Sequence, residues 1–398
     1  MTHAERLPGP LQRRRRPRPS PPVRGRAEAS LAIAAAHAGE VDRDARFPAE
    51  TLAQLRVEGL LGVLAPRRLG GHGGRLADAA ELCFNLARAC GSTAMIFAMH
   101  CTQVACLTRH AAGAEWPTAL LAETVRDQLL FAGSTTDGAG GDPRASGCAL
   151  TAAGDRLRLD KDASVFSYAP FADAALVTAR RRPDSVATDQ VLVALRRQDM
   201  VLVETRTWDA MGLRGTGSAG YRLRGDCAAE QVLPAPFGEI HPQTMLPFSH
   251  VLWSSVWLGI AADALDRARR RLRGSPSGAG GVAGARLAAA VGALQTLRAM
   301  VVVAIQEIDA AQPAQLATFA SQTRLNLLKA EVSRGALQAT LQALEICGVE
   351  GYRNDGVHSV SRHLRDICSA PLMIPNDRIL QYAAQTSVLL DLNPGLFD

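Results

Sequence analysis

Aromatic residues are scarce in this chain, and several patterns that would indicate a function are missing. Phe, Trp and Tyr together make up 5% of the sequence, which argues against a surface that binds nucleic acid by stacking on aromatic rings. The eight cysteines form no CxxC pair, and Cys101 and Cys106 lack the spacing of zinc ligands. We therefore expect neither nucleic acid nor a metal ion as a partner.

Long apolar runs are missing too. No uninterrupted apolar run reaches the roughly 18 residues that a membrane span needs, and the N-terminus lacks the apolar segment of a signal peptide. Most cysteines sit in apolar, helix-like segments, where a free thiol behaves as a small hydrophobic group. Such thiols suit a reducing compartment. The sequence therefore predicts a cytoplasmic protein with no membrane partner.

The composition is that of a globular protein of two or three domains. The chain has 398 residues, of which 47% are hydrophobic and 21% charged, enough for sizeable cores. The formal net charge is +6, and much of this excess lies in the first 30 residues. We predict that residues 1–26, which contain the basic run Arg13–Arg16, form a disordered tail. A targeting or nucleic-acid role for the tail is the alternative.

Hydrophobic periodicity divides the remaining chain into three parts. Residues 27–127 have the pattern of a helical domain. Residues 128–240 contain short apolar runs separated by turn residues at intervals of about ten, which is typical of a small antiparallel β-barrel or sandwich. Residues 244–398 return to helix, and the long apolar periods predict a four-helix bundle. Its expected helices cover residues 248–272, 283–309, 314–347 and 358–383, so the fold class is α+β and mostly α.

A glycine-rich corner in the middle domain suggests how the three parts are related. The stretch from Trp208 to Ser218 reads WDAMGLRGTGS, and its glycines allow a sharp reversal between strands. Alone, this pattern predicts a hairpin corner. Two further motifs accompany it: the loop Gly138–Asp142, GAGGD, and the C-terminal segment Cys347–Tyr352, CGVEGY, which is followed by RHLRD at Arg362–Asp366.

Together these motifs resemble those of the acyl-CoA dehydrogenase superfamily of flavoproteins. The resemblance covers nearly the whole chain after residue 26. It implies an N-terminal helical domain, a middle antiparallel β-barrel domain and a C-terminal four-helix bundle around FAD. It also implies a homodimer or homotetramer, because in this family the adenosine half of the cofactor lies at a subunit interface.

The resemblance assigns flavin contacts to two loops of the middle domain. Thr135 and Ser167 match hydroxyl residues that meet the isoalloxazine ring, and Gly140 and Gly141 lie in the loop after the first strand. Gly141 stands where the family has a serine, which suggests a changed approach of the substrate. Val165 stands where many members stack a tryptophan on the ring, so that stacking is lost here.

Further cofactor contacts are implied in the C-terminal part. Gly348 and Gly351 match a glycine turn that receives the diphosphate of a neighbouring subunit's cofactor, although Val349 replaces the second glycine of this turn. Asn376 matches a hydroxyl position on the adenosine side. His100, in an apolar helix beneath the flavin site, matches a position near the substrate, although a satisfied core histidine is the default interpretation of a lone histidine there.

The catalytic base expected of an acyl-CoA dehydrogenase is missing. Dehydrogenation of an acyl thioester needs a carboxylate that removes the α-proton while hydride moves to flavin N5. The two positions at which the family carries this glutamate fall on Ile374 and Ser249. His250 is the nearest titratable group in the sequence, and a neutral imidazole can act as a base.

Three functions remain open at this point. The first is FAD-dependent α,β-dehydrogenation of an acyl-CoA or acyl-carrier thioester, with His250 as the base and an unknown electron acceptor. The second is a monooxygenase of the same fold, which uses reduced flavin and oxygen to hydroxylate a substrate and needs no glutamate. The third is a flavin-binding protein without turnover.

Overall fold

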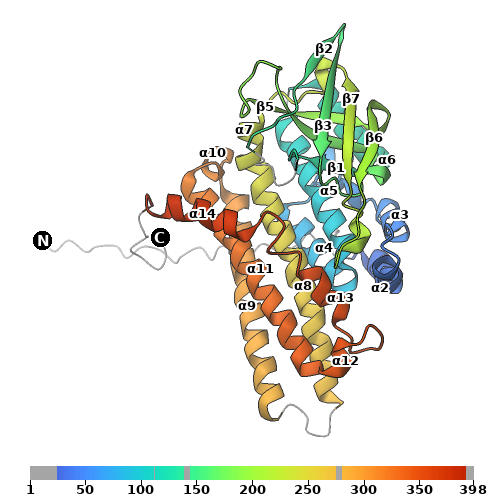
Figure 1. Ribbon diagram of the computed structural model, residues 1–398, viewed down its shortest axis with the longest axis vertical. Helices are drawn as coiled ribbons and strands as arrows, with labels where there is room; N and C mark the ends of the chain where they lie inside the picture. The colour runs from blue at the N-terminus through green and yellow to red at the C-terminus, as the bar shows by residue number, and fades with distance from the viewer. Residues whose placement is uncertain (1–24, 112, 139–143, 275–279, 391–398) are drawn as a thin grey trace, which may run out of the picture.

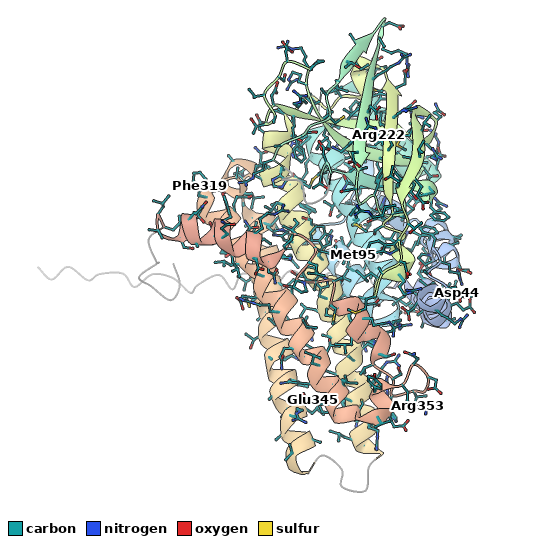
Figure 2. All side chains as sticks on the ribbon, viewed as in Figure 1. Asp44, Met95, Arg222, Phe319, Glu345 and Arg353 are labelled. Carbon is teal, nitrogen blue, oxygen red and sulfur yellow. The ribbon has the colours of Figure 1, made fainter. Side chains whose placement is uncertain are left out.

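The computed structural model describes residues 25–111, 113–138, 144–274 and 280–390. Helices precede and follow a β region, and the long C-terminal helices extend away from that region to form the elongated lower part of the molecule (Figure 1). The predicted helix–strand–helix order is therefore confirmed. Figure 2 shows Met95 among the central helices, whereas Arg222 and Arg353 lie on the outside.

The described N-terminal helices are α2 (Glu28–Arg43), α3 (Ala49–Val57), α4 (Leu76–Ala89), α5 (Gly91–His110) and α6 (Glu115–Asp127). Helix α4 begins where the Asp78 carboxylate accepts a hydrogen bond from the Arg75 N–H at 2.8 Å, which satisfies a donor that the first turn leaves free. Helix α5 is apolar around most of its circumference and is buried along almost its whole length. It forms the centre against which β1 and the C-terminal helix α8 pack.

The middle part consists of two sheets. Their strands are β1 (Phe131–Ser134), β2 (Thr151–Ala153), β3 (Arg156–Ala163), β4 (Ala174–Arg180), β5 (Gln190–Arg196), β6 (Met200–Arg206) and β7 (Gly220–Cys227). One sheet has the order β1-β4-β5 and the other β2-β3-β7-β6. Strand β1 pairs with β4 in parallel, so the expectation of an entirely antiparallel β domain is wrong for this pair. Strands β4 and β5 are buried along nearly their whole length, as expected of strands covered on both faces.

The C-terminal part is built on three long helices. Its helices are α7 (Phe237–Ile240), α8 (Leu246–Arg273), α9 (Gly281–Ala310), α10 (Pro313–Leu316), α11 (Phe319–Cys347), α12 (Val349–Tyr352), α13 (Ser361–Ile367) and α14 (Asn376–Ser387). The helix expected over 358–383 is broken into α13 and α14. Pro371 and Pro375 lie in the break, and a proline lacks an N–H donor and disfavours a helical residue before it. Ile374, just before Pro375, has a φ of 53°.

Within the described ranges, two helical stretches are long and apolar enough to cross a membrane by length and composition, although polar residues interrupt them. In the stretch Phe237–Arg273, 89% of the apolar window is buried inside the molecule, as in the core helix of a globular protein. In α9 the buried share is 33%, and its exposed side chains include Val282, Val291 and Val303. The predicted homo-oligomer would cover such a face, but it stays a prediction.

The glycine corner at Trp208–Ser218 contacts helices of both the N-terminal and the C-terminal part. The Leu213 N–H donates to Asp366 Oδ1 of α13 at 2.6 Å, and the Gly215 N–H donates to Ser92 Oγ of α5 at 3.2 Å. A Cβ atom at Gly212 would overlap the backbone carbonyl of Arg365. The corner is therefore a docking element as well as a strand reversal, and Gly212 is required by close approach of the backbone.

Candidate active site

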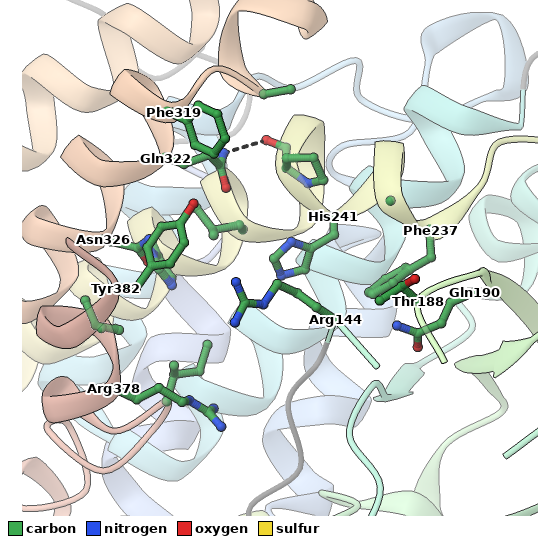
Figure 3. A pocket seen from close by; sticks show the side chains of 17 residues that line it. Arg144, Thr188, Gln190, Phe237, His241, Phe319, Gln322, Asn326, Arg378 and Tyr382 are labelled. Atoms are coloured by element: carbon green, nitrogen blue, oxygen red, sulfur yellow. Dashed lines mark hydrogen bonds between the residues drawn. The ribbon is translucent and has the colours of Figure 1, made fainter. Parts of the chain in front are cut away.

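A cavity of about 370 Å³ lies between the β region and the C-terminal helices. Figure 3 shows its lining side chains entering from the β region, from α7 and the π-helix that follows it, and from α11 and α14. The lining residues are Arg144, Thr188, Gln190, Phe237, Gly238, His241, Pro242, Leu246, His250, Ala317, Phe319, Gln322, Asn326, Ile374, Arg378, Ile379 and Tyr382. A mostly apolar pocket with a few directed polar groups is typical of a small-molecule site.

A π-helix at His241–Met245 brings His241 into the cavity. Such wide turns are rare and often mark functional sites. The turn is held from outside: Thr244 Oγ1 lies 3.1 Å from Arg109 Nε and 2.8 Å from His110 Nε2. On the other side, Gln322 Nε2 donates to the Pro242 carbonyl at 3.0 Å, a bond that Figure 3 shows. The π-helix is thus fixed between α5 and α11.

The charged groups at the cavity are basic. Arg144, Arg378 and His241 line it, and Figure 3 shows these side chains directed into the space between the β region and the helices. The Arg144 guanidinium lies over the Tyr382 ring, 5.4 Å from its centroid, which orients this cation. Among the described residues that line the cavity, none is Asp or Glu. Each of these three basic residues also interacts with other groups of the chain, so an anionic ligand in the cavity is a proposal.

His250 is a buried residue of the cavity lining. Its side chain is 1% exposed. Its Nδ1 lies 3.2 Å from the Leu325 carbonyl, which must accept, so Nδ1 carries the hydrogen. Nε2 has no partner among the described residues and keeps a free lone pair. Burial and the positive charge of Lys329 lower the pKa of His250 to about 3. A base with so low a pKa has little driving force for removing a carbon-bound proton, so His250 as the catalytic base stays a prediction that its surroundings disfavour.

Neither family position for the glutamate carries an acid. Ile374 lines the cavity with an apolar side chain. Ser249 Oγ donates to the Leu246 carbonyl of its own helix at 3.1 Å and lies outside the lining set. The structure thus places an alkyl group at the position where the resemblance leads one to expect the base.

The two residues predicted to meet the flavin ring lie near the ends of strands. Thr135 follows β1 and is half-buried. Ser167 Oγ lies 2.8 Å from Ser218 Oγ, which in turn lies 2.8 Å from Thr216 Oγ1, a row of hydroxyls that starts from the glycine corner. Ser134 Oγ is buried without a partner among the described residues. These donors fit the polar edge of a flavin, and flavin contact by Thr135 and Ser167 stays a prediction.

The other predicted site residues have different surroundings. Gly140 and Gly141 lie outside the described residues. His100 is fully buried, with Nε2 2.8 Å from the Leu61 carbonyl and Nδ1 accepting from the Phe131 N–H at 3.0 Å. Burial lowers its pKa to about 4, and both ring nitrogens are occupied. Substrate binding by His100 therefore receives no support from this geometry, which instead ties α5 to β1.

Gly348 and Gly351 are remote from the cavity. They follow α11, whose other end carries the cavity residue Gln322, and a helix of 29 residues spans roughly 44 Å at 1.5 Å per residue. Gly348 has a φ of 60°, which suits glycine. Within one copy these glycines cannot reach a ligand in the cavity. Their predicted cofactor contact therefore requires the neighbouring subunit that the resemblance implied.

Asn376 begins α14 directly after the turn that contains Ile374. Its Oδ1 accepts from Lys329 Nζ at 2.8 Å, and its Nδ2 donates to Ser333 Oγ at 2.9 Å. The side chain is 7% exposed. The predicted contact with the adenosine side of the cofactor would therefore compete with bonds that Asn376 already makes inside the chain.

The comparisons with known proteins identify the family. The model of the acyl-CoA dehydrogenase N-terminal domain matches residues 23–122, and that of the acyl-CoA dehydrogenase C-terminal domain matches residues 242–373. The chain belongs to the acyl-CoA dehydrogenase superfamily. Metal-ligand groups of three or more His, Cys, Asp or Glu side chains are absent from the described part of this superfamily member.

Similar individual proteins include a nitrososynthase and a monooxygenase. The amino sugar nitrososynthase DnmZ of Streptomyces peucetius is 26% identical over 359 residues, which cover 85% of this chain and 86% of DnmZ. The structure of KijD3 in complex with FMN and dTDP-3-amino-2,3,6-trideoxy-4-keto-3-methyl-D-glucose aligns with a TM-score of 0.80 at 22% identity, covering 94% of this chain and 96% of KijD3. The dibenzothiophene monooxygenase TdsC of Paenibacillus sp. A11-2 aligns with a TM-score of 0.79 at 19% identity, covering 95% and 99% of the two chains.

The sequence did not point to the basic groups of the cavity. Arg144 lies in a loop, His241 in a π-helix and Arg378 in α14. Arg144 lies 97 positions before His241, and Arg378 lies 137 positions after it. None of the three belongs to a motif. The only local signal was the His-Pro pair at residues 241–242, at the change from strands to helices.

Proposed function

We propose that this chain is a flavin-dependent monooxygenase that oxidises an anionic substrate held in the cavity. The observation that carries the proposal is Ile374, because an alkyl group at the base position leaves acyl-CoA dehydrogenation without its proton acceptor. The relatives named as a nitrososynthase and a monooxygenase support the same choice. When bound, reduced flavin would supply two electrons to O2, so that one oxygen atom enters the substrate and the other leaves as water.

The residues of the chain would bind and orient the substrate. Arg144, Arg378 and His241 would hold its anionic group, for which guanidinium is well suited because it forms paired hydrogen bonds. The unprotonated Nε2 of His250 would accept a hydrogen bond from an N–H or O–H of the substrate. The apolar side chains of the lining, among them Phe237 and Ile374, would exclude water and so protect reactive species during oxidation.

The flavin itself is proposed from the superfamily and from neighbours whose structures contain FMN. The chain offers the hydroxyl groups of Ser134, Ser167 and Ser218 for the ring. FAD was the expectation from the family, but Val349 interrupts the turn predicted to hold its diphosphate, and FMN has no diphosphate. Chromatography of the flavin released from the denatured protein distinguishes the two cofactors.

The function is tested by separating oxygenation from dehydrogenation. The protein is loaded with flavin and mixed anaerobically with a panel of acyl-CoAs and dTDP-amino sugars. We expect the flavin to stay oxidised with every compound. With chemically reduced flavin and ¹⁸O₂, we expect one ¹⁸O atom in the product from at least one anionic compound. Bleaching of the flavin by an acyl-CoA without any reductant would instead establish a dehydrogenase, with His250 as the candidate base.

A further inference from the structure

Lysine is nearly absent from this chain, and its two lysines are both buried. The sequence contains 42 arginines but only Lys161 and Lys329, and each lysine side chain is 0% exposed. Every exposed side chain that carries a permanent positive charge is therefore an arginine. An ammonium group differs from a guanidinium by placing three donors tetrahedrally on a compact head. At both lysine positions, the surrounding protein encloses a compact cationic group that has three donors.

Lys161 and Lys329 are enclosed by different partners. Lys161 forms an ion pair with Asp137 and donates to Thr178. Lys329 Nζ donates to the carbonyls of Ala370 at 3.1 Å and Ile374 at 2.8 Å, and to Asn376 Oδ1 at 2.8 Å. Among the described residues, no carboxylate lies within ion-pair distance of Lys329. Lys329 Nζ also lies over the Trp257 ring, 5.4 Å from its centroid. Burial of a cation without a carboxylate partner opposes folding, and the three hydrogen bonds and the ring must offset that cost.

The three acceptors belong to the turn that breaks the predicted last helix. This turn carries Ile374, a β-branched residue whose φ of 53° is a strained conformation. Lys329 bonds to the carbonyl of that strained residue, and the Ile374 side chain lines the cavity. One turn earlier on α11, the Leu325 carbonyl orients His250. One face of α11 therefore fixes two lining residues of the candidate active site.

We propose that Lys329 is a positioning residue of the candidate active site, whose ammonium group holds the Ala370–Asn376 turn so that Ile374 forms a wall of the cavity. The importance of this wall for catalysis rests on the proposed function. The positioning itself does not, because it concerns contacts within the chain. It can therefore be measured without flavin or substrate.

The test is hydrogen–deuterium exchange of the flavin-free protein, read by mass spectrometry on peptides that cover residues 369–380. The experiment is run at pH 6, where Lys329 is charged because burial lowers its pKa only to about 7. Removing three charge-assisted bonds in K329M should speed exchange there by about tenfold or more, because local opening becomes easier. The matched control is K161M, which also removes a buried lysine, and it should leave this segment within about twofold of wild type. K329R should resemble K329M, since a planar guanidinium cannot supply three tetrahedral donors in the same space.

A second comparison separates positioning from general stabilisation. I374G removes the strain at residue 374, so the turn then needs less restraint. K329M should change exchange of the segment by less than about threefold in the I374G background. If K329M does not fold, K329Q replaces it, since its amide keeps two donors and should give an intermediate effect.

Two results would overturn the proposal: equal exchange of residues 369–380 in K329M and K161M, or an equal effect of K329M with and without I374G. Absence of oxygenase activity would refute the proposed function and leave the exchange result standing.

Discussion

The buried carboxyl of Asp366 should make the stability of this protein depend on pH in a direction unusual for an acid. Asp366 is 3% exposed, and its Oδ1 accepts the Leu213 N–H of the glycine corner. Burial raises the pKa of this carboxyl to about 6 from an ordinary value of 3.8, although nearby Arg362 opposes the shift. A carboxyl with a raised pKa favours folding in its protonated form.

The magnitude follows from linkage between protonation and folding. Between pH 3.8 and about 6 the folded state binds more protons at Asp366 than the unfolded state does, so this group lowers the free energy of unfolding as pH rises through that window. A difference of about two pKa units, at 1.36 kcal/mol per unit, corresponds to about 3 kcal/mol. D366N keeps an acceptor for the Leu213 N–H but cannot ionise.

The assay is urea unfolding of wild type and D366N, followed by circular dichroism from pH 4 to pH 7. The difference between the two proteins cancels the contributions of other titrating groups. From pH 4 to pH 7 this difference should move by about 2 kcal/mol in favour of D366N, because part of the full change of about 3 kcal/mol is already lost below pH 4. A difference that stays constant within about 0.5 kcal/mol would refute the reasoning, since it would mean that Asp366 titrates alike in the folded and unfolded states.

Three further predictions concern the cavity and the corner. R378A should weaken binding of the anionic substrate by about 10- to 100-fold, because one charge-assisted hydrogen bond is lost. Its kcat should change much less. Binding of a purely apolar substrate should not be weakened. H250A should leave single-turnover oxygenation by reduced flavin and O2 within about tenfold of wild type, because the imidazole there orients but does not transfer a proton; a fall of a thousandfold would show that His250 is a base after all. G212A should destabilise the protein by more than about 3 kcal/mol, because its Cβ would overlap the Arg365 carbonyl. Chemical unfolding of the variant and of wild type measures this difference. A value below about 1 kcal/mol would mean that the corner can shift away from α13 at little cost.

The sequence by itself determined the architecture and the family. Helical and strand periods are local properties, so the order of helical, β and helical parts could be predicted from residues alone. The motifs at Trp208–Ser218 and Cys347–Asp366 led to the superfamily that the family models confirm. The absence of a glutamate at Ile374 was also visible in the sequence, because it depends only on counting from a motif. That absence alone makes a monooxygenase an alternative to a dehydrogenase.

Only the tertiary structure decided how these residues are used. Pairing of β1 with β4 in parallel joins strands that are distant in sequence, and local alternation carries no information on strand direction. Both ring nitrogens of His100 are hydrogen-bonded, because folding brings the Leu61 carbonyl and the Phe131 N–H, from different elements, next to the imidazole. The basic cavity exists because folding brings Arg144, His241 and Arg378 together. Charge, burial and hydrogen bonding are properties of neighbours in space, and for these side chains the neighbours come from remote parts of the chain.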